Sequence, residues 1–260
     1  MLITLIILTW NRYQFLDRCL SSLFANLSGS CEYEILIMDN GSTDKTGEIL
    51  NGLENRGMSC VRVIRNLSNK GLNAYKRLFG MAHGDYIIEI DDDILSFPKD
   101  FDQTMIDYMN VYSDYGFLAL NVIQDEHTNG AKPDSSFYTE DIRGDMVVEK
   151  GPTGGWCSCF RKRDYRKIRF FFNLIPLNMK RCEDGTLAAL FRFILRLHAG
   201  LIKNAVCLHA CGPYYAKLYG QTDREIEKYM TAGLTEIAKN YRPADNKPSP
   251  SSATCPRETH

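Results

Sequence analysis

Short apolar runs alternate with amphipathic segments along the first half of the chain. Residues 2–8 form a continuous, β-rich apolar run, and between residues 13 and 25 the large apolar side chains recur on one helical face. The same alternation predicts strands at 34–38, 60–64 and 86–90 and helices at 45–53 and 72–82. Fully apolar strands separated by helices are typical of a parallel sheet covered on both faces. The pattern therefore predicts an α/β fold with a mostly parallel central sheet.

The second half of the chain is less regular. One more helix and strand are predicted at 99–112 and 117–122, and the polar stretch 124–144 then predicts a long loop. After Gly151 to Phe160 comes an aromatic and basic segment up to residue 179. Later elements are predicted as a helix at 184–199, a strand at 205–208 and a helix at 224–240. We expect a single domain over 1–241 and, from its Pro and Ser content, a disordered tail over 242–260.

Composition narrows the choice of partner and compartment. The 31 basic and 32 acidic residues nearly cancel, which argues against a nucleic acid partner. Nine cysteines without paired CxxC spacing are typical of reduced thiols, so we expect a cytoplasmic protein. The apolar opening at 1–8 is too short to span a membrane and lacks the basic start of a signal peptide. It predicts a buried first strand.

Polar loops follow three of the predicted strands, at 9–12, 39–44 and 91–93. In a parallel sheet these loops meet at the carboxyl edge, where ligands bind. Asp91 and Asp93, two residues apart, point to one side if the strand geometry persists. Converging carboxylates repel one another unless a cation offsets their charge, and hard oxygen ligands select Mg²⁺ or Mn²⁺, which bind diphosphates. A solvated acidic turn is the alternative interpretation.

The loop from Asp39 to Asp44 has turn composition, and Asp44 is placed to cap the helix that begins at Lys45. Capping does not account for Asp39, a carboxylate directly after a buried strand. Such a carboxylate can accept hydrogen bonds from a nucleobase or a ribose.

These motifs resemble, in order and spacing, inverting family-two glycosyltransferases of GT-A fold. The segments that carry the resemblance are Thr9-Trp10-Asn11-Arg12, Asp39 to Asp44, Asn69-Lys70-Gly71 with Ala74, Gly84-Asp85-Tyr86 and Asp91 to Asp93. The resemblance implies a Rossmann-like sheet with flanking helices in a single domain. It further implies a nucleotide-sugar-binding half over 1–122 and an acceptor-binding half over 123–241.

The resemblance also assigns roles to residues of the first half. It implies that Thr9, Trp10 and Asp39 bind the nucleotide, that Asp91 binds ribose and that Asp93 binds Mn²⁺ or Mg²⁺. Three further residues join the donor-binding set, namely Arg12, Lys70 and Asp92. Lys76 stands where the family more often has an arginine; a lysine keeps the charge towards the diphosphate but loses bidentate geometry.

In the second half the resemblance runs more loosely through Gly154-Gly155-Trp156 with Phe160-Arg161, and through Cys182-Glu183-Asp184. Displacement at an anomeric carbon needs a carboxylate that takes the acceptor proton, and the family places it here, at Asp184. Glu183 and Trp156 are then expected to bind the acceptor. Helix capping by first-turn acids is the alternative for Glu183 and Asp184.

His209 follows a predicted strand, and the resemblance implies a third metal ligand near this position. A hydrogen-bonded structural histidine is the alternative, and His198 is a competing candidate. The family implies metal-dependent transfer from a nucleotide sugar, taken here as a UDP-sugar, to a hydroxyl of a glycan, lipid-linked or protein acceptor in surface-glycan synthesis. Because the chain lacks the Gln-x-x-Arg-Trp signature of processive synthases, we expect single transfers.

Two other functions stay open on sequence alone. A sugar nucleotidyltransferase needs a Gly-rich, Arg-containing loop after the first strand, and residues 9–12 contain no glycine. A protein that binds nucleotide sugars without catalysis would not need the acidic set. Separately, segments 161–169 and 191–197 mix cations with large apolar residues. They predict either a peripheral contact with the inner face of a membrane or core-facing helices with arginine at their margins.

Overall fold

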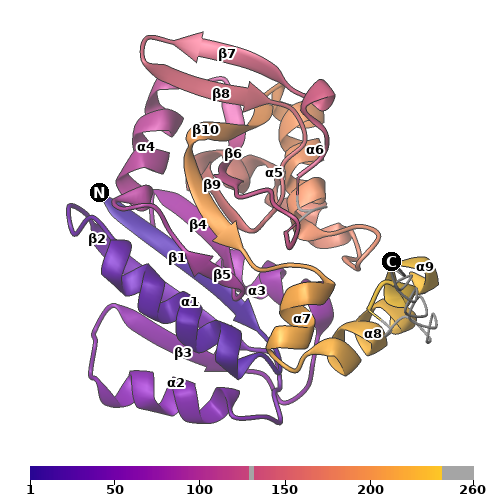
Figure 1. Cartoon of the computed structure of the whole chain (residues 1–260). Helices are drawn as coiled ribbons and strands as arrows, with labels where there is room; N and C mark the ends of the chain where they lie inside the picture. The colour runs from indigo at the N-terminus through magenta and orange to yellow at the C-terminus, as the bar shows by residue number, and fades with distance from the viewer. Residues whose placement is uncertain (129–131, 242–260) are drawn as a thin grey trace, which may run out of the picture.

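One mixed sheet of ten strands runs through both halves of the part of the chain that the structure describes (Figure 1). This computed structural model describes residues 1–128 and 132–241, so the predicted disordered tail at 242–260 lies outside it. The strands are β1 (Leu2–Thr9), β2 (Glu32–Asp39), β3 (Val61–Arg65), β4 (Tyr86–Asp91), β5 (Ile94–Ser96), β6 (Tyr115–Val122), β7 (Thr139–Arg143), β8 (Met146–Lys150), β9 (Cys157–Arg161) and β10 (His198–His209). Their order is β3-β2-β1-β4-β9-β6-β10-β8-β7, with β5 paired to β10 beside this path.

Helices cover both faces of this sheet. They are α1 (Tyr13–Asn26), α2 (Thr46–Asn55), α3 (Ala74–Met81), α4 (Phe101–Val111), α5 (Lys162–Leu174), α6 (Glu183–Leu195), α7 (Pro213–Leu218), α8 (Thr222–Thr231) and α9 (Thr235–Lys239), with short 3-10 turns η1 (Gly71–Asn73) and η2 (Ser135–Phe137). Buried residues of α1, α2 and α4 belong to one core cluster, and those of α3, α5 and α6 to another. None of the described helices is long and apolar enough to cross a membrane.

The predicted α/β fold is confirmed, and its parallel part lies in the first half of the chain. Strands β3, β2, β1 and β4 pair in parallel. On β1, Ile3, Leu5 and Ile7 pack into one cluster while Ile6 packs into the other, because successive side chains of a strand point to opposite faces. Burial on both faces explains why this strand is apolar except for the buried Thr4 and Thr9. Beyond β4 the sheet is mixed, since β9 is antiparallel to both β4 and β6.

Several element predictions for the second half are wrong. The predicted loop at 124–144 contains η2 and β7, and β7 forms a hairpin with β8 at the edge of the sheet. The predicted helix at 184–199 ends at Leu195 because Arg196 is left-handed, with φ 60°, and residues 198–209 form β10 instead of a strand over 205–208. The predicted helix at 224–240 is divided into α8 and α9 around Gly233, whose φ is 67°. The basic segment that was given no element is α5.

A buried arginine connects β9 to its neighbours in the part of the sheet that has both parallel and antiparallel strands. Arg161, at the end of β9, is 3% exposed. Its guanidinium donates to the carbonyls of Tyr115, at 2.7 Å, of Tyr112, at 3.2 Å, and of Met109. Met109 and Tyr112 lie at the end of α4, where carbonyls have no partner within the helix. Arg161 therefore joins β9 to the helix α4 and the strand β6.

We expect Arg161→Met to lower the free energy of unfolding by about 3 kcal/mol, because buried carbonyls would lose a charged donor. Urea denaturation followed by circular dichroism measures this change. Arg163→Met is the matched control, since Arg163 is exposed and in no described ion pair, and it should shift stability by less than about 0.5 kcal/mol. Similar losses in both variants would contradict the structural role of Arg161.

Candidate functional site

The first two loops at the carboxyl edge of the sheet are tied together. Asn11 is left-handed, with φ 53°, and its side chain accepts a hydrogen bond from the backbone of Thr43 at 2.7 Å. In return, the backbone N–H of Asn11 donates to the hydroxyl of Ser42 at 2.9 Å. In the loop after β2, Gly41 has φ 81°, and a Cβ at this residue would lie 2.8 Å from the backbone of Ser68. The loop after β2 therefore requires glycine at this position.

A second set of contacts holds the segment that contains Lys70. The side-chain oxygen of Asn40 accepts from the backbone N–H of Lys70 at 3.0 Å, and its amide donates to Asn69 at 2.8 Å. The loops after β1, after β2 and before α3 are thus connected by polar side chains. This network places Thr9, Trp10 and Lys70 on one cavity.

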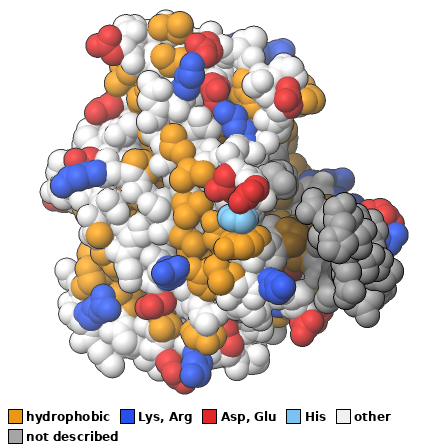
Figure 2. All heavy atoms as spheres, viewed as in Figure 1, with side chains coloured by type: hydrophobic (Ala, Val, Ile, Leu, Met, Phe, Trp, Pro, Cys, Tyr) orange, Lys and Arg blue, Asp and Glu red, His pale blue; other side chains and the backbone are white. Residues whose placement is uncertain are grey.

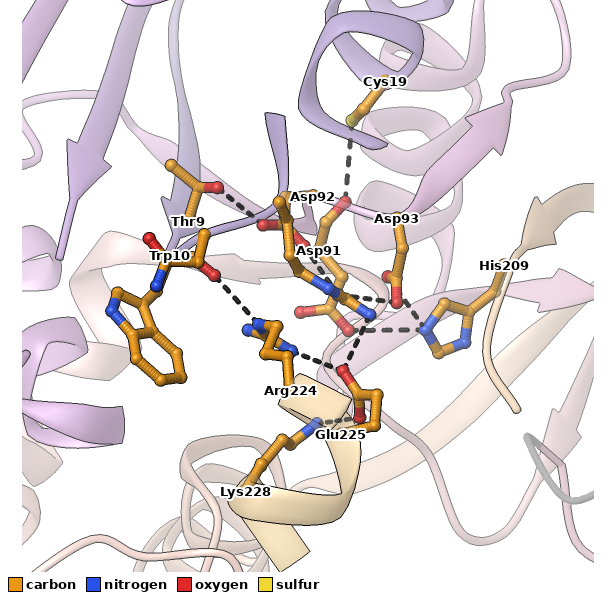
Figure 3. Close-up of polar contacts among 12 residues, drawn as sticks. Thr9, Trp10, Cys19, Asp91, Asp92, Asp93, His209, Arg224, Glu225 and Lys228 are labelled. Carbon is orange, nitrogen blue, oxygen red and sulfur yellow. Dashed lines mark hydrogen bonds and ion pairs between the residues drawn. The ribbon is translucent and has the colours of Figure 1, made fainter. Parts of the chain in front are cut away.

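Three consecutive aspartates follow β4, and they have different partners (Figure 3). Asp92 accepts hydrogen bonds from the hydroxyl of Thr9 at 2.7 Å and from Arg12 at 2.8 Å. Arg12 also contacts Asp93 at 2.8 Å. The guanidinium therefore offsets part of the carboxylate charge that gathers at this edge, and Thr9 and Arg12 hold the aspartate loop against the loop after β1.

Asp91, Asp93 and His209 form a group in which one ligand atom of each residue lies within 4.8 Å of the others. His209 reaches this position because β10 pairs with β5, with His209 opposite Ile94, and because Ala210 donates its N–H to the carbonyl of Asp93. The His209 Nε2 lies 3.2 Å from Asp93 Oδ1 and 3.7 Å from Asp91 Oδ2. The structure brings the three predicted metal and ribose ligands together.

The chemistry of this group fits a divalent cation. Two carboxylates and an imidazole are ligands that Mn²⁺ accepts, and Mg²⁺ prefers the oxygens. The buried Oδ1 of Asp93 accepts no hydrogen bond from the described residues. Burial together with Asp93 raises the pKa of Asp91 to about 7. Burial alone would also raise the pKa of Asp93, but Arg12 and His209 hold it well below its ordinary value. The group therefore has carboxylate charge that a cation would offset.

The sequence did not predict the contribution of α8 to this site. Glu225 is 3% exposed, and it contacts Arg12 at 3.4 Å, Lys228 at 3.2 Å and the adjacent Arg224. The Arg224 Nε donates to the carbonyl of Trp10 at 3.1 Å, and its guanidinium lies 5.1 Å from the centre of the Trp10 ring. Figure 3 shows these three residues of α8 beside the aspartates. Their charge and helical spacing were visible in the sequence, but nothing local indicated their partners.

Two cavities meet at this group of ligands. The larger, of about 780 Å³, has walls from the first loops, the aspartates, the segment before α6 and α8. It is lined by the predicted residues Thr9, Trp10, Arg12, Lys70, Asp91, Asp92, Asp93, Glu183 and His209. The smaller, of about 450 Å³, is lined by Asp91, Trp156, Asp184 and His209, among others. Asp91 and His209 belong to both cavities, so the two spaces adjoin at the candidate metal ligands.

Two predicted donor-binding residues have another place. Asp39 and Lys76 line neither of these cavities. The Oδ1 of Asp39 instead accepts the backbone N–H of Ser42 at 2.9 Å, which closes the turn after β2. Asp39 thus supports the loop that bonds to Asn11, and its direct contact with a nucleotide stays a prediction. The same holds for the contact of Lys76 with a diphosphate.

The predicted catalytic carboxylate lies at the start of α6. Asp184 accepts hydrogen bonds from the backbone N–H groups of Gly155, at 2.9 Å, and of its neighbour Gly185. The bond to Gly185 is a local one at the helix terminus, whereas the bond to Gly155 joins α6 to the loop before β9. Glu183 lines the larger cavity and not the smaller one with Asp184. Burial and Asp184 raise the pKa of Glu183, which favours its neutral form.

Trp156 forms a wall of the smaller cavity. It is 5% exposed, its indole N–H donates to the carbonyl of Leu120 at 2.8 Å, and its ring centre lies 5.9 Å from that of His209. The indole is therefore fixed between the sheet and the metal ligands. It presents an apolar surface to the space in front of Asp184.

Comparison with known proteins agrees with this arrangement. The model of the family described as Glycosyl transferase family 2 matches residues 4–174. Among curated relatives, the chain is 31% identical over 87 residues to the dolichyl N-acetyl-alpha-D-glucosaminyl phosphate 3-beta-D-2,3-diacetamido-2,3-dideoxy-beta-D-glucuronosyltransferase of Methanococcus voltae, covering 33% of this chain and 27% of that protein. It is 30% identical over 94 residues to the poly(ribitol-phosphate) beta-glucosyltransferase of Bacillus spizizenii, covering 36% of this chain and 15% of that one. Both matches therefore span less than a third of the relative's length.

Solved structures share the fold at low sequence identity. The mannosyltransferase PcManGT from Pyrobaculum calidifontis, in complex with GDP-Man and Mn²⁺, has a TM-score of 0.62 at 14% identity, over 92% of this chain and 69% of that chain. S. aureus TarS 1-349 in complex with UDP-GlcNAc has a TM-score of 0.60 at 14% identity, over 93% and 71%. Both are GT-A glycosyltransferases, so the predicted fold type is confirmed.

We expect Asp93→Asn to weaken Mn²⁺ binding about a hundredfold, because a direct ligand is worth at least as much as the outer partners of a metal site. Isothermal titration of MnCl₂ in the presence of UDP measures the affinity. Asp92→Asn is the matched control, because Asp92 faces Thr9 and Arg12 and lies outside the ligand group; it should change the affinity by only a few-fold. Equal affinities in the two variants would place the cation elsewhere.

Proposed function

The chain belongs to glycosyl transferase family 2, and from that premise we propose that it transfers a sugar from a UDP-sugar to an acceptor hydroxyl, with a divalent cation and with inversion at the anomeric carbon. Membership of this family supports a glycosyltransferase over the alternatives of a nucleotidyltransferase or a non-catalytic binding protein. The observation that supports the proposal most strongly is the junction of the two cavities at Asp91 and His209. A donor in one space and an acceptor in the other would meet there.

The larger cavity is the proposed donor site. Thr9, Trp10 and Lys70 would contact the nucleotide from loops that hydrogen bonds already hold in place. Asp91 and Asp92 would complete the donor site, with Asp39 and Lys76 as further candidates. Asp93 and His209, together with Asp91, would hold Mn²⁺ or Mg²⁺. When bound there, such a cation offsets the negative charge that develops on the leaving diphosphate.

Two cations of α8 extend the proposed donor site. Arg224 and Lys228 both line the larger cavity. Each shares Glu225 with Arg12, so three cations surround one carboxylate. Arg224 and Lys228 are suited to a diphosphate, which would accept hydrogen bonds from the donors that Glu225 does not satisfy. Arg12, in turn, would act mainly by holding Asp92 and Asp93, with which it is paired.

Asp184 is the proposed catalytic base. It lines the smaller cavity together with Asp91 and His209, and the backbone of Gly155 orients its carboxylate. From this position Asp184 would take the proton of an acceptor hydroxyl as that oxygen attacks the anomeric carbon and the nucleotide diphosphate leaves on the opposite side. Direct displacement of this kind inverts the anomeric configuration. Trp156 would support the sugar ring of the acceptor, and buried Glu183 would help to position the base.

The proposed acceptor is a hydroxyl of a surface glycan, carried on a lipid or a polymer. The name of the Methanococcus voltae relative includes a dolichyl phosphate-linked sugar, and that of the Bacillus spizizenii relative a poly(ribitol-phosphate). The smaller cavity also contains Lys132, whose ammonium pairs with Glu149. We further propose that residues 1–122 supply most of the donor site and residues 123–241 the acceptor site, with the segment before α6, His209 and α8 as exceptions.

We place the reaction in the cytoplasm. The eight cysteines within the described residues are all free, and four of them are buried. Free thiols persist in a reducing compartment, where nucleotide sugars are also made available to transferases of this type.

We expect Asp184→Asn to reduce turnover by 10²- to 10⁴-fold, roughly the contribution of a general base, while leaving UDP affinity unchanged. Manganese-dependent release of the nucleotide from UDP-, GDP- and dTDP-sugars, with and without acceptor glycans, measures turnover and also tests the choice of UDP. Asp223→Asn is the control, because Asp223 is an exposed acid in the first turn of α8. Wild-type turnover in Asp184→Asn would refute the assigned base.

We expect Arg224→Met to weaken UDP binding about tenfold and to leave the weaker binding of uridine unchanged, since a charge-assisted hydrogen bond is worth roughly 1.5–3 kcal/mol. Titration calorimetry with UDP and with uridine separates the two contributions. Lys217→Met, which removes an exposed cation of α7, is the control. An equal loss for uridine would show that Arg224 acts only by positioning Trp10.

A further inference from the structure

The outer sides of α5 and α6 expose an unusual set of large apolar side chains. Both helices have a core face, formed by Ile168 and Phe172 on α5 and by Leu187 and Phe191 on α6. Away from that face are Phe170, 69% exposed, Phe171, 47%, Leu174, 66%, Phe193, 69%, and Ile194, 40%. We call the exposed side chains of α5, α6 and the connecting segment 175–182 the α5–α6 surface. The helices therefore face the core and also carry apolar groups that the core does not use.

The α5–α6 surface is strongly basic. Nine lysines and arginines lie between residues 162 and 196, namely Lys162, Arg163, Arg166, Lys167, Arg169, Lys180, Arg181, Arg192 and Arg196. Of these nine side chains, only that of Lys167 has an ion pair with another described residue, Asp164 at 3.1 Å. Burial lowers the pKa of Lys162, and the charges of Arg166 and Arg169 lower it further, against an opposing effect of Glu34. The positive charge of the surface is thus largely uncompensated.

Acidic side chains are kept away from this surface. There is none between Tyr165 and Cys182 and none between Gly185 and Leu197. Asp164 and Glu183 are buried, and Asp184 lines the smaller cavity. By contrast, the face drawn in Figure 2 shows acidic and basic side chains interspersed. In a chain with a formal net charge of −1, the separation of charge on α5 and α6 is a local feature.

We propose that the α5–α6 surface docks on an anionic lipid bilayer. Unpaired cations attract anionic headgroups, and exposed phenylalanines enter the boundary between headgroups and acyl chains. The contact would be peripheral, since no described helix can cross a membrane. A second copy of the chain is a poorer occupant, because it would bring the same positive charge to the interface.

The position of the surface links it to the cavities. The segment between α5 and α6 lines the larger cavity through Leu177, Asn178, Met179 and Cys182, and α6 begins with Glu183 and Asp184. A docked molecule would therefore hold its cavities close to the headgroups, where an acceptor carried on a lipid is presented. This consequence rests on the proposed function, whereas the docking itself does not.

The test is flotation of the full chain with vesicles of phosphatidylcholine alone and of phosphatidylcholine with about 30% phosphatidylglycerol, an anionic lipid. We expect binding only to the anionic vesicles, and its loss at high salt because exposed charges are screened. The triple variant Arg163→Gln, Arg166→Gln and Arg192→Gln should bind about a hundredfold more weakly. Phe170→Ser with Phe193→Ser should also lose about tenfold or more.

Matched controls lie outside the α5–α6 surface, on α2 and β3 and their flanks and on η2. Lys45→Gln, Arg56→Gln and Arg62→Gln remove three exposed cations that have no described ion pair, and Phe137→Ser removes an exposed phenylalanine of η2. These variants should bind vesicles as the wild type does. Nucleotide release from a UDP-sugar, measured without vesicles, should be unchanged in all of them, which separates failure of docking from failure of the proposed reaction.

Three outcomes would overturn the docking proposal. These are equal binding to both kinds of vesicle, wild-type binding by the triple variant, and failure of the wild type to bind anionic vesicles. A change of oligomeric state in the α5–α6 variants, detected by size-exclusion chromatography with light scattering, would assign the surface to a second copy and would also reject the bilayer.

Discussion

The ion pairs of Arg12 are the contact on which the rest of the site depends. Strand β4 ends in three aspartates at a largely buried edge of the sheet, and carboxylates so close together are unstable without positive charge. Arg12 contacts Asp92, Asp93 and Glu225, and so joins the loop after β1, the loop after β4 and helix α8. The same contacts of the guanidinium offset the charge of the carboxylates and hold the two loops and the helix in place. Asp92 is thereby kept for Thr9 and Arg12, while Asp91 and Asp93 face His209.

The three aspartates have different partners, which explains how a short acidic motif supports more than one role. Asp92 is used internally, Asp93 contacts both Arg12 and His209, and the side chain of Asp91 is 34% exposed towards the cavities. Positively charged side chains lie around the same point, namely Arg12, Arg224 and Lys228. A diphosphate and a cation bring opposite charges of similar size. Under the proposed function the site would change little in net charge when both bind, which would make burial of the ligands less costly.

The sequence predicted the elements whose pattern follows from burial. Strand β1 is mostly apolar because both its faces are covered. The carboxyl ends of parallel strands brought Thr9, Arg12, Asp91 and Asp93 together as expected. The hairpin of β7 and β8 was missed because β7, at the sheet edge, has polar and largely exposed residues that resemble a loop. Arg224 and Glu225 were missed because their role depends on residues more than two hundred positions away, which leave no local pattern. Asp39 has the predicted place after β2 but bonds within its own loop.

Arg12 and Glu225 are 213 positions apart in the sequence, and this separation affects the order in which the protein folds during synthesis. A ribosome delivers the sheet strands and the aspartate loop long before it delivers α8. Until α8 has been synthesised, the contact of Glu225 with Arg12 and the cations Arg224 and Lys228 are missing. The nascent chain can therefore form its first strands before the charges around the aspartates are complete. The contact between Arg12 and Glu225 can therefore form only after the strands of the sheet and the aspartate loop have been synthesised.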